Sequence, residues 1–72
     1  MKQGRFADAE REFRAASDVL PREAAIQYHL GLVAHQQGRT VEASSAFKRA
    51  LLLDPQFEEA ASARKLIQEL GG

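Results

Sequence analysis

The most constraining feature of this sequence is a repeat with a fixed period. The segment QGRFADAEREFRAASDVLP (residues 3–21) aligns without a gap on QGRTVEASSAFKRALLLDP (residues 37–55), so each residue lies 34 positions from its counterpart. The identical pairs are Gln3 and Gln37, Gly4 and Gly38, Arg5 and Arg39, Ala9 and Ala43, Phe13 and Phe47, Ala16 and Ala50, and Pro21 and Pro55. Glycine, phenylalanine and proline in one register are not expected by chance. Because a unit of this length cannot bury its apolar face alone, the chain must stack its repeats against one another.

Apolar residues recur every three or four positions along the chain, which is typical of amphipathic helices. Proline and glycine interrupt this pattern at Pro21, Gly38 and Pro55. The pattern therefore predicts four helices, at about residues 5–20, 23–37, 40–53 and 56–70. No stretch alternates with period two over a useful length, so the expected fold class is all-α.

On these residues the whole chain resembles the tetratricopeptide repeat (TPR) family, whose repeats are antiparallel pairs of helices, A and B. The family's small residue of helix A falls on Gly31, and its later signature positions fall on Ala43, Phe47, Ala50 and Pro55. Two positions depart from the family pattern, because Gln27 and Ala34 stand where large aromatic residues are expected. The resemblance implies a single domain, an α-solenoid fragment of antiparallel helix-turn-helix repeats. Its parts are helix B of a partial repeat (4–23), one complete repeat (24–57) and a C-terminal capping helix (58–72).

Gly31 is unusual because it lies inside a predicted helix, where glycine costs about 1 kcal/mol relative to alanine. The resemblance implies that Gly31 meets Ala43 where the two helices approach most closely. The packing of Leu30, Val33 and Phe47 around this point would offset the cost. We therefore expect a structural role for Gly31 and not a hinge, with leucine there strongly disfavoured and alanine tolerated better.

The two ends of the chain differ in their expected packing. Phe6, Ala9 and Phe13 would face a helix A that this chain lacks, which gives two copies a reason to cover each other's apolar stripes. Association must also overcome its entropic cost, so only a weak, concentration-dependent homodimer is expected. Near the other end, polar residues replace Leu30, Gly31 and Ala34, as suits a capping helix that faces water. These polar residues are Arg64, Lys65 and Gln68.

Signals for catalysis or for a cofactor are weak. His29 and His35 are six residues apart, so one helix face cannot offer both side chains to a metal. The serines have no nucleophile motif around them, and the glycines form no phosphate-binding loop. Adjacent acids such as Glu58 and Glu59 are common in the first turn of a helix. We therefore expect no enzyme activity, no cofactor and no metal.

Charge and composition narrow the kinds of partner. Ten basic and ten acidic residues are interspersed along the chain, which argues against a nucleic-acid-binding protein. No apolar run approaches the length of a membrane span, and the first residues do not resemble a signal peptide. The chain has no cysteine, which excludes disulfides and fits a reducing compartment. A cytoplasmic location without a membrane partner is the expectation.

The resemblance implies that the A helices line a concave surface for a peptide or protein partner. Tyr28 and Leu32 either hold an apolar side chain of the partner or pack against the adjacent A helix, and both alternatives stay open. His35 is either a contact residue or a solvated residue at a helix end. The positions that would face the partner are Ala25, Tyr28, Leu32, His35, Gln36, Glu59, Ser62, Leu66 and Glu69.

Some TPR domains hold a partner's terminal carboxylate with Lys, Arg and Asn on this surface. Here the corresponding positions are Tyr28, Leu32, Ser62 and Leu66, so that clamp is absent. A partner with apolar anchors and positive charge, to meet Glu59 and Glu69, is expected instead. Two other functions stay open. One is a self-association or scaffold segment of a larger TPR protein. The other is an RNA-binding repeat, which the zero net charge disfavours.

Overall fold

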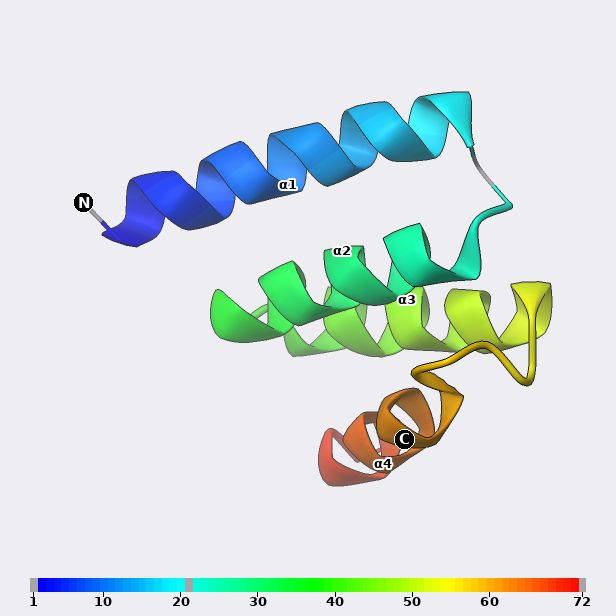
Figure 1. The fold of residues 1–72 in the computed structure, drawn as a ribbon. Helices are drawn as coiled ribbons and strands as arrows, with labels where there is room; N and C mark the ends of the chain where they lie inside the picture. The colour runs from blue at the N-terminus through cyan, green and yellow to red at the C-terminus, as the bar shows by residue number, and fades with distance from the viewer. Residues whose placement is uncertain (1, 21, 72) are drawn as a thin grey trace.

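The computed structural model describes the backbone of residues 2–20 and 22–71 and the side chains of residues 7–20 and 22–71. Within these ranges the chain forms four helices and no strand, which confirms the all-α fold (Figure 1). Their bounds are α1 (Lys2–Val19), α2 (Ala24–Gln36), α3 (Thr40–Leu53) and α4 (Ala60–Glu69). None of them is long and apolar enough to cross a lipid bilayer.

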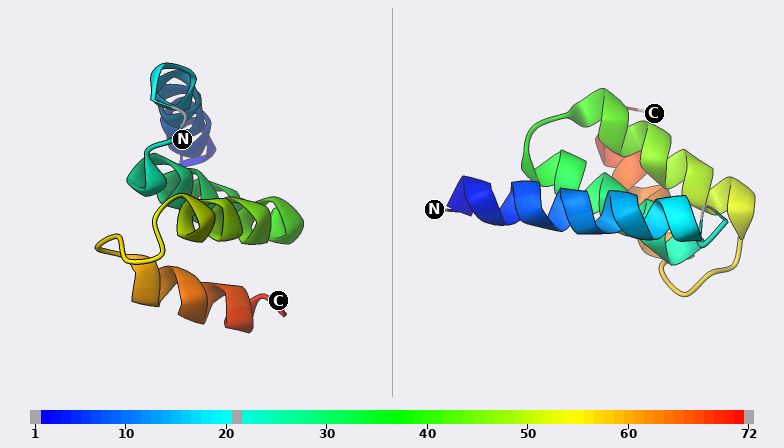
Figure 2. Two further views of the ribbon diagram at one scale, coloured as in Figure 1. Left: turned by 90° about the vertical axis from the view of Figure 1, so that its right-hand side faces the viewer. Right: turned by 90° about the horizontal axis from the view of Figure 1, so that it is seen from above.

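The helices form a row in which neighbours in sequence are neighbours in space. α2 runs antiparallel to both α1 and α3, and α4 lies on the far side of α3 from α1 (Figures 1 and 2). The closest association is between α2 and α3, the two helices of the complete repeat. α1 packs on α2, and α4 packs on α3, so the complete repeat is flanked on both sides.

Local chemistry explains why α2 and α3 end where they do. Gly38 has a φ of 77°, a left-handed conformation that glycine adopts without strain. It lets the Arg39 N–H donate to the Ala34 carbonyl at 2.9 Å, which closes the end of α2. α3 ends before Asp54, whose backbone is extended because the next residue is Pro55.

Two helix boundaries were predicted wrongly. α4 begins at Ala60 and not near Gln56, because the Asp54 carboxylate accepts the Gln56 N–H at 3.1 Å and holds a turn there. α1 begins at Lys2 and not near Arg5. Gly4 takes helical dihedral angles, unlike its counterpart Gly38. Pro21 lies outside the described residues.

The core is built largely from small side chains around aromatic rings. Phe47 is completely buried, and the ring of Tyr28 lies 5.5 Å from it. Alanines on three helices let the backbones come close enough to enclose these rings. The buried cluster comprises Ala24, Tyr28, Ala43, Phe47, Ala50 and Ala63, with Leu32, Leu51, Phe57, Leu66, Ile67 and Leu70 among the half-buried residues packed against it.

Gly31 is buried at the contact between α2 and α3, where the ring of Phe47 lies nearest to it. A Cβ atom on Gly31 would lie 2.5 Å from Cε1 and 2.6 Å from Cδ1 of Phe47. The three nearest atoms therefore belong to the Phe47 ring, so Phe47 provides the closest contact at this position. A ring needs more room than a methyl group, which is why only glycine fits beneath it.

Replacing Gly31 with Ala should destabilise the fold, and leucine should destabilise it further. Overpacking costs about 1–3 kcal/mol, whereas the gain in helix propensity is about 1 kcal/mol. Because Phe47 is completely buried and packs against Tyr28, its ring cannot move aside freely. Urea unfolding followed by circular dichroism measures the loss.

The matched control is Gly31→Ala in a Phe47→Leu background, which lacks the ring. There the added methyl group should be neutral or stabilising, so the two changes should couple strongly in a double-mutant cycle. An equal effect of Gly31→Ala in both backgrounds would show that the ring is not what requires the glycine.

Candidate functional site

The predicted partner-facing positions lie on α2, on α4 and on the turn before α4. At 100° per residue, the five positions on α2 share one side of that helix. The exposed members of the set are His35, Gln36, Ser62 and Glu69; Ala25, Leu32, Glu59 and Leu66 are half-buried, and Tyr28 is buried. We call these nine residues the α2/α4 surface.

Tyr28 is a core residue. Only 8% of it is exposed, and its ring lies 5.5 Å from that of Phe47 and 5.8 Å from that of Phe57. Of the two alternatives for Tyr28, the structure favours packing. Leu32 and Leu66 also pack against the core but keep part of their surface in water, so they are the apolar groups that a partner can reach.

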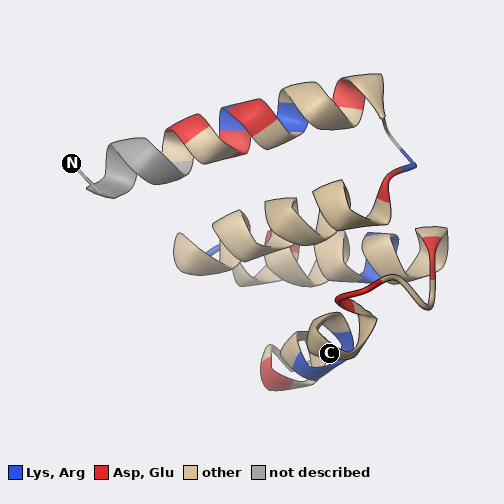
Figure 3. Ribbon diagram, in the orientation of Figure 1, with Lys and Arg blue, Asp and Glu red and all other residues tan. Residues whose placement is uncertain are grey.

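The acidic residues of the α2/α4 surface lie at the two ends of α4, and α2 contributes none. α2 contains no Asp, Glu, Lys or Arg, whereas Glu59 directly precedes α4 and Glu69 is its last residue (Figure 3). The basic residues Arg64 and Lys65 of α4 are exposed, as predicted for its outward face, and Arg64 donates to the Pro55 carbonyl at 2.7 Å. The α2/α4 surface therefore combines a neutral part with an acidic part.

The signature residues of the repeat hold this surface in place. Ala43, Phe47 and Ala50 have no exposed surface, and Gly31 is also buried. Pro55 is exposed in the turn that leads to α4. These residues position α2 and α4 relative to each other and are not themselves available to a partner, apart from Pro55.

α1 is attached to the complete repeat through Glu10 and Phe13. Glu10 accepts hydrogen bonds from Arg14 at 2.7 Å, from Arg39 at 3.1 Å and from Gln37 at 3.4 Å. The ring of Phe13 stacks on that of His29, with centroids 5.2 Å apart. Phe13 was expected to face a helix that the chain lacks. The structure corrects this, because the Phe13 ring packs against His29 of α2.

A buried amide joins three helices. Gln27 is 4% exposed; its Nε2 donates to Ser17 Oγ on α1 at 2.7 Å, and its Oε1 accepts from Arg49 Nε on α3 at 3.0 Å. Both ends of the amide are therefore satisfied, as burial requires. Sequence reasoning noted Gln27 only as a departure from the family pattern; its spacing from Ser17 and Arg49 carries no signal of this network.

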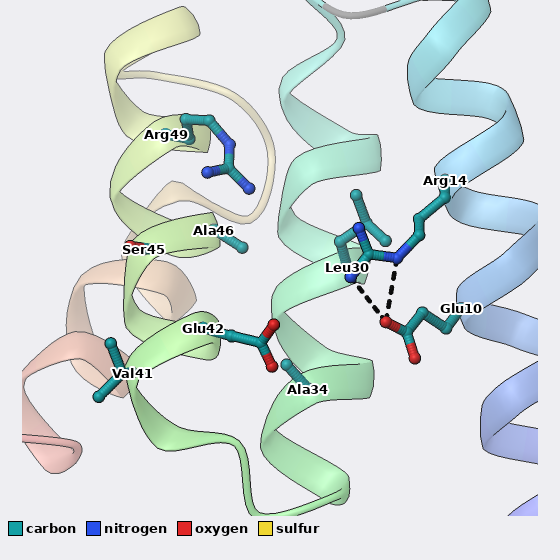
Figure 4. Close-up of a pocket in the computed structure, with 9 residues that line it drawn as sticks. All are labelled: Glu10, Arg14, Leu30, Ala34, Val41, Glu42, Ser45, Ala46 and Arg49. Atoms are coloured by element: carbon teal, nitrogen blue, oxygen red, sulfur yellow. Dashed lines mark hydrogen bonds and ion pairs between the residues drawn. The ribbon is translucent and has the colours of Figure 1, made fainter.

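A groove that sequence reasoning did not find runs between α1 and α3, with α2 as its floor. One hollow of about 300 Å³ lies beside Glu10 (Figure 4). A second, of about 430 Å³, continues it toward the end of α1. Both are lined by Arg14, Leu30 and Arg49. The first also contacts Glu10, Ala34, Val41, Glu42, Ser45 and Ala46, and the second Ser17, Asp18 and Gln27.

The arginines around Glu10 set its acidity. The hydrogen bond from Arg14 lowers the pKa of this carboxyl below its usual 4.5, with help from the charges of Arg39 and Arg14 and the Gln37 hydrogen bond, and against the effect of desolvation. Arg14, four residues along the same helix, could be anticipated from the sequence. Arg39 and Gln37 could not, because they reach Glu10 only when α1 packs on α2.

Comparison with known proteins identifies one family. A family model described as tetratricopeptide repeat matches residues 1–63. No curated protein and no solved structure matches the chain.

Replacing Glu10 with Gln should lower the free energy of unfolding at neutral pH by less than about 1 kcal/mol, because the arginines that pair with it are partly exposed. The folded-state pKa lies below 4.5, so the contribution of the carboxylate is fully present above that pH and is lost as the pH falls through the folded value. The difference between the two proteins should therefore disappear in acid. Thermal melts across this pH range test it.

Glu12→Gln is the matched control, because Glu12 is exposed on the same helix. It should leave the melting temperature nearly unchanged at neutral pH. A Glu10→Gln effect that persists undiminished in acid would mean that the side chain acts through packing and not through its charge.

Proposed function

Because the chain belongs to the tetratricopeptide repeat family, we propose that it is a non-catalytic interaction module that presents the α2/α4 surface to a peptide or protein partner. Members of this family generally mediate protein–protein interactions. The partner is expected to have apolar anchors and positive charge. The lack of cysteine supports a reducing compartment, so the proposal places the module in the cytoplasm.

The observation that carries this proposal is the accessibility of one side of α2 and α4. His35, Gln36 and Ser62 are exposed there, and the half-buried Leu32 and Leu66 lie among them. Because Tyr28 is enclosed by the core, a partner's apolar side chain would meet the two leucines and not the tyrosine ring. A Lys or Arg beside that side chain would meet Glu59 or Glu69, so binding should weaken as salt is raised.

A second candidate is self-association through α1. None of the side chains of residues 7–19 is buried, and Leu20, at the end of the apolar stripe, is 53% exposed. Phe13 and Ala9 are half-buried, so part of the stripe is already covered by α2. The side chain of Phe6 lies outside the described residues. A dimer through this stripe would therefore bury little apolar surface and would be weak.

Ser62→Arg should weaken binding of peptides selected from a displayed library on the intact chain. The new side chain would cover Leu66 and introduce positive charge where the partner's own positive charge is expected. We expect about tenfold weaker binding by calorimetry, since 1.4 kcal/mol corresponds to a factor of ten. Helicity and melting temperature should not change, because Ser62 is exposed.

Ser45→Arg is the matched control, with the same change at an exposed serine on the α1–α3 groove. It should leave the affinity of those peptides unchanged. If Ser45→Arg weakened binding and Ser62→Arg did not, the α2/α4 surface would not be the site that the peptides occupy.

The chain should show weak, concentration-dependent dimerisation in sedimentation equilibrium, and Leu20→Lys should shift it toward monomer. Leu20 is exposed and follows the last residue of α1, so this change should leave helicity intact. Val41→Lys is the control, because Val41 is 81% exposed but lies on α3. A chain that stays monomeric at millimolar concentration would contradict self-association.

A further inference from the structure

Arg49 occupies the groove between α1 and α3 in a fixed orientation. Its Nε donates to Oε1 of Gln27 at 3.0 Å, and the other end of that amide donates to Ser17 Oγ at 2.7 Å. Gln27 is buried and held at both ends, so it fixes the plane of the guanidinium. A side chain that is already ordered loses little further entropy when it binds a ligand.

The outer edge of this guanidinium is available. Among the described residues, no hydrogen bond joins Nη1 or Nη2 of Arg49 to the protein, and no salt bridge involves it. These two nitrogens present parallel N–H donors, an arrangement that matches the two oxygens of a carboxylate. Figure 4 shows the side chain extending from α3 into the space between the helices.

The charges around Arg49 make it the best site for an anion in the groove. Arg14 uses Nε and Nη2 on Glu10, and Arg39 contacts both Glu10 and Glu42. Arg49, in contrast, is paired with a neutral amide. An incoming carboxylate would therefore complete a pair at Arg49 without displacing an existing one.

The rest of the groove limits the kind of anion. Leu30 and Ala34 form an apolar floor and Ala46 is 3% exposed, so an apolar side chain next to the carboxylate would be covered. Asp18 and Glu42 line the groove as well, and they would repel a dianion more than a monoanion. Phosphate and nucleic acid are disfavoured by this arrangement.

We propose that the α1–α3 groove is a second binding site, which receives an acidic residue of a protein partner flanked by an apolar residue, with its carboxylate on Arg49. Leu30 and Ala34 lie on the side of α2 opposite Leu32 and Gln36, by 100° per residue. The groove is therefore separate from the α2/α4 surface, and its function does not depend on the function proposed for that surface. Two partners would be able to bind at once.

The test is a nuclear magnetic resonance titration of the isotopically labelled chain with the peptide acetyl-Leu-Glu-Leu-amide. The Arg49 side-chain Nε–H signal and the backbone amides that line the groove on α1 and α3 should shift together. The matched peptide acetyl-Leu-Gln-Leu-amide should produce much smaller shifts, because it has no carboxylate. Equal shifts with the two peptides, or larger shifts with inorganic phosphate, would overturn the proposal.

Variants separate recognition by Arg49 from general electrostatic attraction. Arg49→Met should weaken the binding of the Glu peptide by about tenfold or more, as expected when hydrogen bonds to a charged group are lost. Lys48→Met is the matched control, because it removes one positive charge from the adjacent position, which lines a different hollow beside Leu70. It should leave the affinity unchanged, and an equal loss would overturn the proposal.

Two further variants keep the test decisive if Arg49→Met unfolds. Arg49→Lys keeps the charge but lacks the two parallel donors, so it should also bind the Glu peptide more weakly. Asp18→Asn removes an acid from the groove and should strengthen binding. Wild-type affinity in Arg49→Lys together with no gain in Asp18→Asn would overturn the role of the guanidinium. Ser62→Arg on the other surface should not affect this peptide.

Discussion

The fold of this chain depends on the contact between the Phe47 ring and the backbone of α2 at Gly31. A Cβ atom on residue 31 would lie only 2.5 Å from the Phe47 ring, too close for any residue but glycine. Phe47 itself is completely buried. Tyr28 packs on Phe47, and Phe57 packs on Tyr28, so the turn before α4 is positioned through the same ring system. In α4 the position 34 residues after Gly31 is the exposed Lys65. A second aromatic ring therefore cannot dock on α4 in the way that Phe47 docks on α2.

α1 is held by a different kind of contact. None of residues 7–19 is buried, and the helix is fixed by a carboxylate network at Glu10, a ring stack at Phe13 and a hydroxyl at Ser17. Such partly exposed polar contacts contribute less than a buried core does. α1 is therefore attached to the rest of the chain largely by contacts at its half-exposed surface. The groove between α1 and α3 exists only while these contacts hold.

The sequence predicted the features that depend on local chemistry and on the repeat. The break between α2 and α3 at Gly38, the end of α3 before Pro55 and the exposed face at Lys65 follow from single residues or from the spacing of 34. The errors arose where a side chain from another element decides the outcome. The placement of Phe13 on His29 depends on a tertiary contact, and the start of α4 depends on one side-chain hydrogen bond. The α1–α3 groove was missed for the same reason, because its lining comes from three helices.

Gln27 shows how a departure from a family pattern can link the core to a surface. An amide buried without partners would cost about 1–3 kcal/mol, so this position requires a donor and an acceptor from neighbouring helices. Ser17 and Arg49 supply them, and neither would do so alone, since each satisfies one end of the amide. This buried network also affects the surface, because the hydrogen bond from Arg49 Nε to Gln27 Oε1 orients the Arg49 guanidinium in the groove. An aromatic residue at position 27 would fill the same space but would accept no hydrogen bond from Arg49, and the guanidinium would lose its fixed orientation. The departure at this position and the geometry of the groove are therefore two parts of one network.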